Sequence, residues 1–169
     1  MSAKERPIIN DLPRTKVELA CEVVAAAALV CAWAVALSAW SDLPQRVPTH
    51  FDFSGRPDAW GSKGVFLVLP IVLLVLYALL TLLSRVPHIY NYPVPITPEN
   101  APTQYRLARG LLAEMKAVIS VAFAYLTWSV TAVARGFRED LGAWFLFTLL
   151  LALAGLLAKY LIAAYRSAS

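Results

Sequence analysis

The chain consists of long apolar blocks separated by shorter polar segments. Four blocks, residues 23–40, 64–83, 117–134 and 141–158, contain no charged side chain over 18 to 20 consecutive positions. Because an α-helix rises about 1.5 Å per residue, each block can cross about 30 Å of hydrocarbon. The pattern predicts an all-α, polytopic membrane protein with four transmembrane helices.

The polar segments define the expected parts of one membrane domain. In chain order these are a loosely ordered cytoplasmic tail (1–16), a first helical hairpin (17–84) with a structured outer loop (41–63), a Pro-rich cytoplasmic strap and short helix (85–108), and a second helical hairpin (109–169). Within the strap, Thr97, Pro98 and Glu99 are typical of a helix start. We expect the helix that follows to continue into the third span.

Composition and charge narrow the class of protein further. Hydrophobic residues make up 59% of the chain and charged residues 15%, against about 45–50% and about 25% in soluble domains. An ordinary water-soluble domain is therefore excluded. Of the 15 lysines and arginines, ten lie on the side of the predicted membrane that carries the termini and five on the other. They form no single basic face, so no nucleic-acid partner is expected, and the positive-inside rule predicts that both termini are cytoplasmic.

Several residues in and near the spans predict how the helices pack. Small residues repeat every four positions at Ala28, Ala32 and Ala36, which predicts a closely packed helix face. In the second span, Pro70 predicts a static kink. Glu18 and Glu22 are interpreted as helix-start residues at the membrane interface. The basic residues before the third span are expected to contact anionic headgroups, with recognition of a cytoplasmic protein as the alternative; they are Arg106, Arg109 and Lys116.

The outer loop holds the densest group of candidate site residues. Residues 47–54 alternate, so an extended segment would present His50 and Asp52 on one face and aromatic side chains on the other. A turn is expected at residues 54–58, and the aromatic residues could fold the loop onto the membrane surface. The residues expected to bind a ligand or to structure the loop are His50, Phe51, Asp52, Gly55, Asp58 and Trp60.

The same loop allows a weak metal hypothesis. His50, Asp52 and Asp58 have ligand types that zinc accepts, but a structural zinc site usually takes four ligands. An imidazole–carboxylate hydrogen bond that fixes the loop is the favoured interpretation, and no metal or other cofactor is expected. Because no catalytic motif is present, we assign no catalytic residue and expect a protein that is not an enzyme.

Motifs in both loops resemble one family. The outer loop contains Leu43-Pro44, Val47-Pro48, His50-Phe51, Gly55, Pro57-Asp58 and Trp60 to Lys63. These residues resemble a bacterial membrane family, the domain of unknown function 1648, in which a span, this kind of outer loop and the next span cover residues 23–80 or so. The inner-loop residues similar to longer relatives are Asn91-Tyr92-Pro93, Ile96-Thr97, Glu99-Asn100, Tyr105 and Arg109.

The resemblance implies a multi-pass protein of the bacterial inner membrane. Some members resemble the immunity protein against a sporulation-delaying toxin, which protects the producer and can sequester a transcriptional repressor at the membrane. That immunity protein is expected to have helices beyond the four spans of this chain. The implied partners are membrane lipids, an extracytoplasmic peptide or toxin and a cytoplasmic protein. The implied inner-loop site residues are Asn91, Tyr92, Glu99, Asn100, Tyr105 and Arg109.

Three classes of function are therefore open. The leading hypothesis is a non-enzymatic, immunity-like protein whose outer loop senses a peptide or lipid and whose inner loop transmits the signal. The second is a small transporter or ion-coupled permease, with a homodimer as one form. Against it, the predicted span cores contain no acid, base or histidine, whereas transport pathways usually carry ionisable groups near the midplane. The third is an accessory or structural subunit of a membrane complex.

Overall fold

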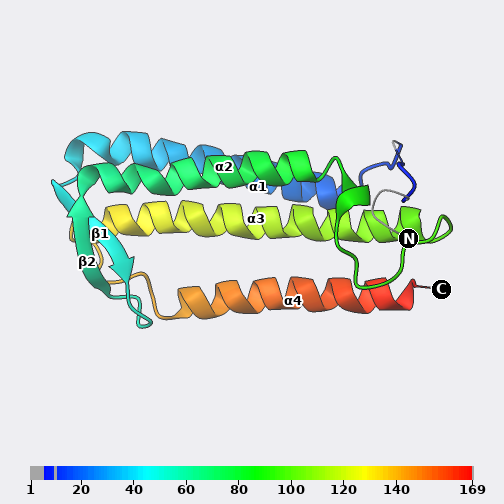
Figure 1. Ribbon diagram of the computed structural model, residues 1–169. Coiled ribbons are helices and arrows are strands. Elements are labelled where there is room, and N and C mark those ends of the chain that lie inside the picture. Colours follow the sequence, from blue (N-terminus) through cyan, green and yellow to red (C-terminus); the bar gives the residue numbers. More distant parts are fainter. Residues whose placement is uncertain (1–5, 10, 169) are drawn as a thin grey trace.

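The computed structural model describes residues 6–9 and 11–168, which form a long helical bundle (Figure 1). Within these residues, four helices are long and apolar enough to cross a membrane, so the chain is a multi-pass membrane protein. They are α1 (Lys16–Ala39), α2 (Val68–Leu83) with the preceding 3₁₀ turn η3 (Lys63–Leu67), α3 (Ala101–Ala134) and α4 (Trp144–Arg166). Two further 3₁₀ turns are η2 (Trp40–Asp42) and η4 (Pro87–Ile89).

The central helix is α3, with α1 and α2 on one side and α4 on the other (Figure 1). Helix α1 runs parallel to α3 and packs closely against it. The predicted small-residue face explains this, because Ala28, Ala32 and Ala36 are at most 9% exposed. The described start of the chain and the C-terminus of α4 lie at the same end of the bundle (Figure 1). We call this the terminal end and the opposite end the hairpin end.

A small sheet at the hairpin end corrects the all-α prediction. Strands β1 (Arg46–Phe51) and β2 (Pro57–Ser62) form an antiparallel hairpin between α1 and α2. The register pairs Pro48 with Trp60, His50 with Ala59, and Phe51 with Pro57. Thr49 is therefore an extra residue on β1 and Asp58 an extra residue on β2. These two bulges break the simple alternation expected for residues 47–54, and both Val47 and Pro48 are buried.

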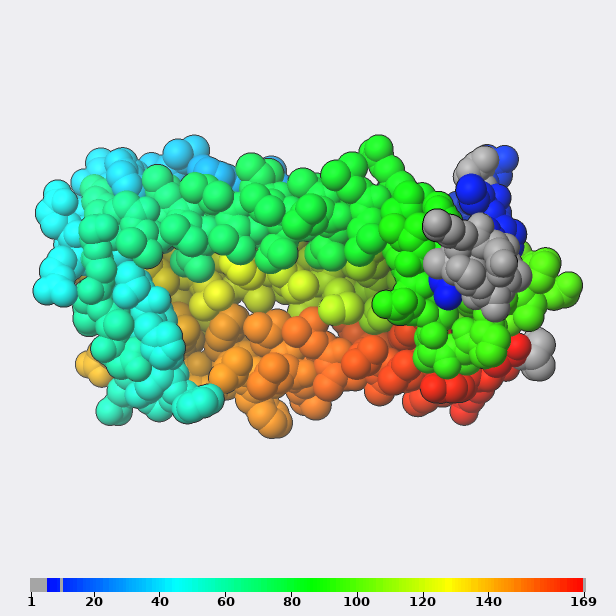
Figure 2. Space-filling model, viewed as in Figure 1, coloured from blue at the N-terminus to red at the C-terminus, as the bar shows by residue number. Residues whose placement is uncertain are grey.

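The hairpin extends across the end of the bundle from α2 to the start of α4 (Figure 2). Val47 packs in one cluster with Phe66 and Val130, which joins β1 to η3 and α3. At the turn, the Gly55 carbonyl accepts a hydrogen bond from the Leu141 backbone N–H at 2.8 Å. The fourth block therefore does not begin as a lipid-facing helix at Leu141. Gly142 has φ +89°, and α4 starts only at Trp144.

Two other predictions concern the first turns of helices, at the start of α3 and at the start of α2. Helix α3 begins at Ala101, three residues after Pro98, with Pro102 in its first turn, and then continues unbroken into the membrane span as expected. The Thr97 carbonyl accepts from the Ala101 N–H at 2.9 Å, so residues 97–100 form a turn before the helix. Pro70 is the third residue of α2, directly after η3, so its missing N–H lies in the first turn of α2.

The described part of the N-terminal tail makes specific contacts instead of lying loose. Tyr105 on α3 donates its hydroxyl to the Pro7 carbonyl at 3.1 Å, and Arg109 donates to the carbonyls of Leu12 and Pro13 at 2.9 Å each. Because these acceptors are backbone carbonyls, they were not recognisable from residue type. The tail is thereby fixed against the first turns of α3.

Candidate functional site

A cavity of about 330 Å³ lies beneath the hairpin. This volume is at the lower limit for small-molecule pockets, about 300–1,000 Å³, and suits one or two large apolar side chains. Most of the lining is apolar and comes from β1, η3, the start of α2, α3 and Leu141, while His50 and Thr49 supply polar groups. The lining residues are Pro48, Thr49, His50, Phe51, Val65, Phe66, Val68, Leu69, Leu126, Val130 and Leu141.

The His50 side chain contacts Asp58. An imidazole–carboxylate hydrogen bond of this kind is the interpretation that the sequence favours. The His50 Nδ1 atom lies 2.6 Å from Asp58 Oδ1, and both side chains remain about half exposed or more, at 68% and 48%. The bulges at Thr49 and Asp58 bring this pair together across the two strands. The cavity lining therefore includes an accessible imidazole, and the carboxylate that pairs with it lies outside the lining.

Asp52 acts separately, within the turn of the hairpin. Its Oδ1 atom accepts from the Ser54 N–H at 2.8 Å, the Ser54 hydroxyl at 2.7 Å and the Arg56 N–H at 2.9 Å. These hydrogen bonds, led by the Ser54 hydroxyl, lower the pKa of the Asp52 carboxyl below its ordinary value. The charged form therefore stabilises the turn above the ordinary pKa, and this contribution is lost as the pH falls through the lowered value.

The three residues of the metal hypothesis do not form one site. Asp52 is engaged in the turn, whereas His50 and Asp58 pair with each other. Over residues 6–9 and 11–168, no group of three His, Cys, Asp or Glu side chains is placed to hold a metal ion. The arrangement favours recognition of a polar group by hydrogen bonding.

Gly55 and the aromatic residues complete the hairpin end. Gly55 has φ +82°, and a Cβ there would lie 3.2 Å from the Gly142 nitrogen, so the turn and the loop before α4 fit closely. Phe51 packs against the buried cluster, whereas Phe53 is 91% and Trp60 42% exposed. Only part of the predicted aromatic cap thus faces the protein, and the rest is accessible to lipid or a ligand.

Four of the six inner-loop candidates are buried or half-buried at the terminal end. The Tyr92 ring contacts the Tyr105 ring at a tilt, with ring centroids 5.6 Å apart. Asn100, 6% exposed, donates to the carbonyls of Pro95 and Ala168 at 3.1 Å each. Arg109 donates through Nε to Glu18 at 2.6 Å. These residues fix the strap, the tail and α4 to α3.

The other two candidates, Asn91 and Glu99, are exposed on the strap. A hydrogen bond from Thr97 lowers the pKa of the Glu99 carboxyl, which keeps it charged at neutral pH. By contrast, burial raises the pKa of Tyr90 in the same strap to about 12. Asn91 and Glu99 are therefore the inner-loop candidates that are accessible from outside the protein.

A second charged pair, not predicted from the sequence, lies between α1 and α3. Lys116 is 2% exposed and donates to Glu22 at 2.6 Å and to the Thr81 hydroxyl of α2 at 3.0 Å. Its ammonium also lies 4.7 Å from the centre of the Tyr77 ring. Arg109 and Lys116 thus bind acids of α1 and not headgroups, whereas Arg106 is exposed. The available signal was the matching order of two acids on α1 and two bases on α3.

The depth of this pair is relevant to the transporter hypothesis. At about 1.5 Å per residue, Lys116 is about 28 Å from Arg135 along α3, and Glu22 about 27 Å from Trp40 along α1. Because the hydrocarbon core is about 30 Å thick, the pair lies near its boundary at the terminal end and not at the midplane.

Comparison with known proteins identifies the segment that contains the hairpin. A family model described as "Domain of unknown function (DUF1648)" matches residues 27–74, from α1 through the hairpin into α2, which confirms the resemblance for this segment. An uncharacterized protein of Archaeoglobus fulgidus is 36% identical over 74 residues, covering 39% of this chain and 40% of the relative. The chain thus matches less than half the length of that relative. No solved structure matches this chain.

Proposed function

We propose that this multi-pass membrane protein is a non-enzymatic receptor that binds an extracytoplasmic, membrane-active peptide at its hairpin end. The observation that carries the proposal is the apolar cavity beneath β1, whose lining includes the accessible His50 that pairs with Asp58. An apolar side chain of the peptide would enter the cavity while a polar group contacts the imidazole or the carboxylate. Binding would keep the peptide from inserting elsewhere in the bilayer, as in an immunity function.

The hairpin suits a peptide because it combines three modes of contact. The outer strand β2 is mostly exposed and has no further strand beside it among the described residues, so its free edge can pair with an extended backbone. Phe53 and Trp60 add exposed aromatic area near the bilayer surface. The inner-membrane location and the signal to a cytoplasmic protein through Asn91 and Glu99 belong to the same proposal.

Survival of bacterial cells challenged with a synthetic amphipathic cationic peptide tests this function. Cells that express the protein should survive higher peptide doses than cells with an empty vector. His50→Ala removes the polar contact, and Val68→Trp fills the cavity from its 51% exposed rim position, so both should reduce protection. Val72→Trp is the matched control, because Val72 is also exposed on α2, at 37%, but does not line the cavity.

Equal survival with the protein and with the empty vector would refute the immunity function. Direct binding of the same peptide to the reconstituted protein separates binding from protection. If Val68→Trp displaces a co-purified lipid and leaves peptide binding unchanged, the cavity is a lipid site and the peptide proposal is wrong.

An accessory subunit is the second candidate function, favoured by α4. This helix packs mainly on α3, and its small residues Ala154 and Ala158 are exposed instead of facing the rest of the chain. Such a face allows close approach of a partner helix. Co-purification of one stoichiometric partner from native membranes, abolished by Ala154→Leu, would support this alternative over the receptor.

A further inference from the structure

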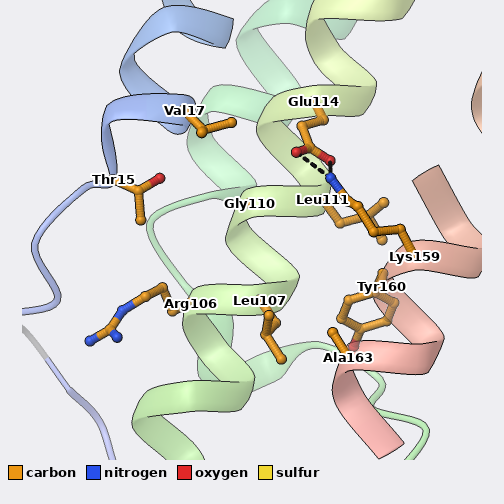
Figure 3. A pocket seen from close by; sticks show the side chains of 10 residues that line it. All are labelled: Thr15, Val17, Arg106, Leu107, Gly110, Leu111, Glu114, Lys159, Tyr160 and Ala163. Carbon is orange, nitrogen blue, oxygen red and sulfur yellow. Dashed lines mark hydrogen bonds and ion pairs between the residues drawn. The ribbon is translucent and has the colours of Figure 1, made fainter. Parts of the chain in front are cut away.

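A groove of about 300 Å³ lies at the terminal end, where α1 and α4 flank the same face of α3 (Figure 3). Its floor contains Gly110 and Leu111, and its walls include Val17 of α1 and Tyr160 of α4. A Cβ added to Gly110 would meet no atom within 4 Å, so the space above this glycine is open. The groove is an apolar trough that the chain itself does not fill.

Lys159 and Arg106 of the groove retain N–H groups that can donate to a ligand. Lys159 donates to both carboxylate oxygens of Glu114, but an ammonium has three N–H groups, and the Lys159 side chain is 59% exposed. Arg106 lies on the Thr15 side of the groove, with the Glu114–Lys159 pair at the other end (Figure 3). Arg106 forms no ion pair with the described residues. Because the Glu114–Lys159 pair is neutral overall, Arg106 gives the groove a net positive charge.

The groove lies at the depth of lipid headgroups. We take Arg135 as the membrane boundary at the hairpin end. At about 1.5 Å per residue, Glu114 then lies about 31 Å from Arg135 along α3, and Gly110 about 37 Å. The hydrocarbon core is about 30 Å thick, and the headgroup layer begins there. A charged group bound in the groove would therefore be at the level where phospholipids carry their phosphate.

Toward the hairpin end, α3 and α4 form a second apolar groove of about 230 Å³. Its α3 residues include Val118, Val121 and Ala122, which follow Gly110 and Glu114 at spacings of three and four and so share their helix face. The α3 face that carries both grooves thus runs from the headgroup layer into the hydrocarbon core.

We propose that this groove binds one acidic phospholipid of the leaflet at the terminal end. The phosphate accepts a hydrogen bond from Lys159, Arg106 at the other end of the groove attracts the anionic headgroup by its charge, and an acyl chain follows the α3–α4 groove. Basic pockets between transmembrane helices bind acidic headgroups in this way. A partner helix fits less well, because it would bury Arg106 and Lys159 without supplying an acid for Arg106. The proposal does not depend on the receptor function of the hairpin end.

Native mass spectrometry of the purified full-length protein tests the lipid site. Titration with phosphatidylglycerol and with phosphatidylcholine of identical acyl chains should show preferred binding of the acidic lipid. Arg106→Gln should weaken phosphatidylglycerol binding about fivefold, the equivalent of about 1 kcal/mol per basic residue near a headgroup. Gly110→Leu fills the open space and should weaken binding by at least about tenfold, or more than 1.4 kcal/mol.

Two matched controls keep this test specific. Gly155→Leu makes the same substitution on α4, again with no atom within 4 Å, but outside the groove. Arg85→Gln removes an exposed charge after α2. Both controls should bind phosphatidylglycerol like the unchanged protein. The proposal is wrong if both lipids bind equally, if Gly110→Leu behaves like Gly155→Leu, or if inorganic phosphate alone competes as well as the lipid.

Discussion

Lys116 carries a positive charge into a site that is almost closed to solvent. A buried charge is tolerated only when partners satisfy it, and here Glu22, the Thr81 hydroxyl and the Tyr77 ring do so. These partners come from α1 and α2, so one side chain of α3 connects three helices. Removing only one member of the Glu22–Lys116 pair should therefore cost more stability than removing both.

Lys116→Met should lower the free energy of unfolding by about 3 kcal/mol, because Glu22 would keep its charge without a partner. Thermal or SDS-induced unfolding in detergent measures this loss. The double variant Glu22→Leu/Lys116→Met should recover most of the stability, since no unpaired charge remains. Lys159→Met is the control at an exposed pair and should cost no more than about 1 kcal/mol. Equal losses for Lys116→Met and Lys159→Met would contradict the role given to burial.

The hairpin is the element whose geometry depends most on close backbone approach. Gly55 holds a positive φ at the turn, and its carbonyl binds the Leu141 N–H of the loop before α4. The turn thus connects the hairpin to the second helical pair across the end of the bundle. A side chain at position 55 would disturb both the turn and this connection.

Gly55→Ala should destabilise the hairpin end by about 1–3 kcal/mol, the usual cost of a strained backbone conformation. The Cβ would also lie 3.2 Å from the Gly142 nitrogen. Limited proteolysis of residues 52–58 in reconstituted protein should therefore accelerate. Gly64→Ala is the matched control, because Gly64 has no positive φ and no neighbour within 4 Å of an added Cβ. Identical cleavage rates for the two variants would show that the close fit at Gly55 is unimportant.

The elements that could be predicted from the sequence are those whose signal is local. Uncharged blocks predicted the four spans, and the repeat of Ala28, Ala32 and Ala36 predicted the packed face of α1. The start of α4 was less predictable, because Leu141 is apolar like the span but binds the turn of the hairpin. Apolar character alone does not distinguish a residue buried by a loop from one buried by lipid.

The candidate site was predicted in its residues more than in its geometry. His50 and Asp58 were both selected, but their contact depends on bulges that arise only when the two strands pair. The inner-loop candidates Tyr92, Asn100, Tyr105 and Arg109 contact chain segments up to 98 positions away. Local spacing does not encode such long-range contacts. Only for the ion pairs between α1 and α3 was a signal present, in the matching order of the acids and bases.

At the scale of the whole molecule, the bundle has two chemically different ends. The hairpin end combines a small sheet with an apolar cavity, and the terminal end combines ion pairs with backbone contacts from the strap and the tail. The distribution of lysine and arginine predicts that the terminal end is cytoplasmic.

Cysteine labelling tests this orientation in a Cys21→Ala/Cys31→Ala background. Ser54→Cys in the exposed turn of the hairpin should react with a membrane-impermeant maleimide in intact cells. Asn91→Cys in the exposed strap should react only after permeabilisation. The reverse pattern would place the hairpin in the cytoplasm and would remove the basis for an extracytoplasmic ligand.

The ion pairs between α1 and α3 also constrain how the protein is made. Glu18 and Glu22 are translated 91 and 94 residues before Arg109 and Lys116. Until α3 is synthesised, both acids lack these basic partners, and their place at the boundary would let water solvate them. Synthesis of α3 then supplies the two bases, so the native bundle can close only after the third helix has left the ribosome. A first helical hairpin that inserted before α3 would therefore hold two acids without their basic partners until the third helix joined it.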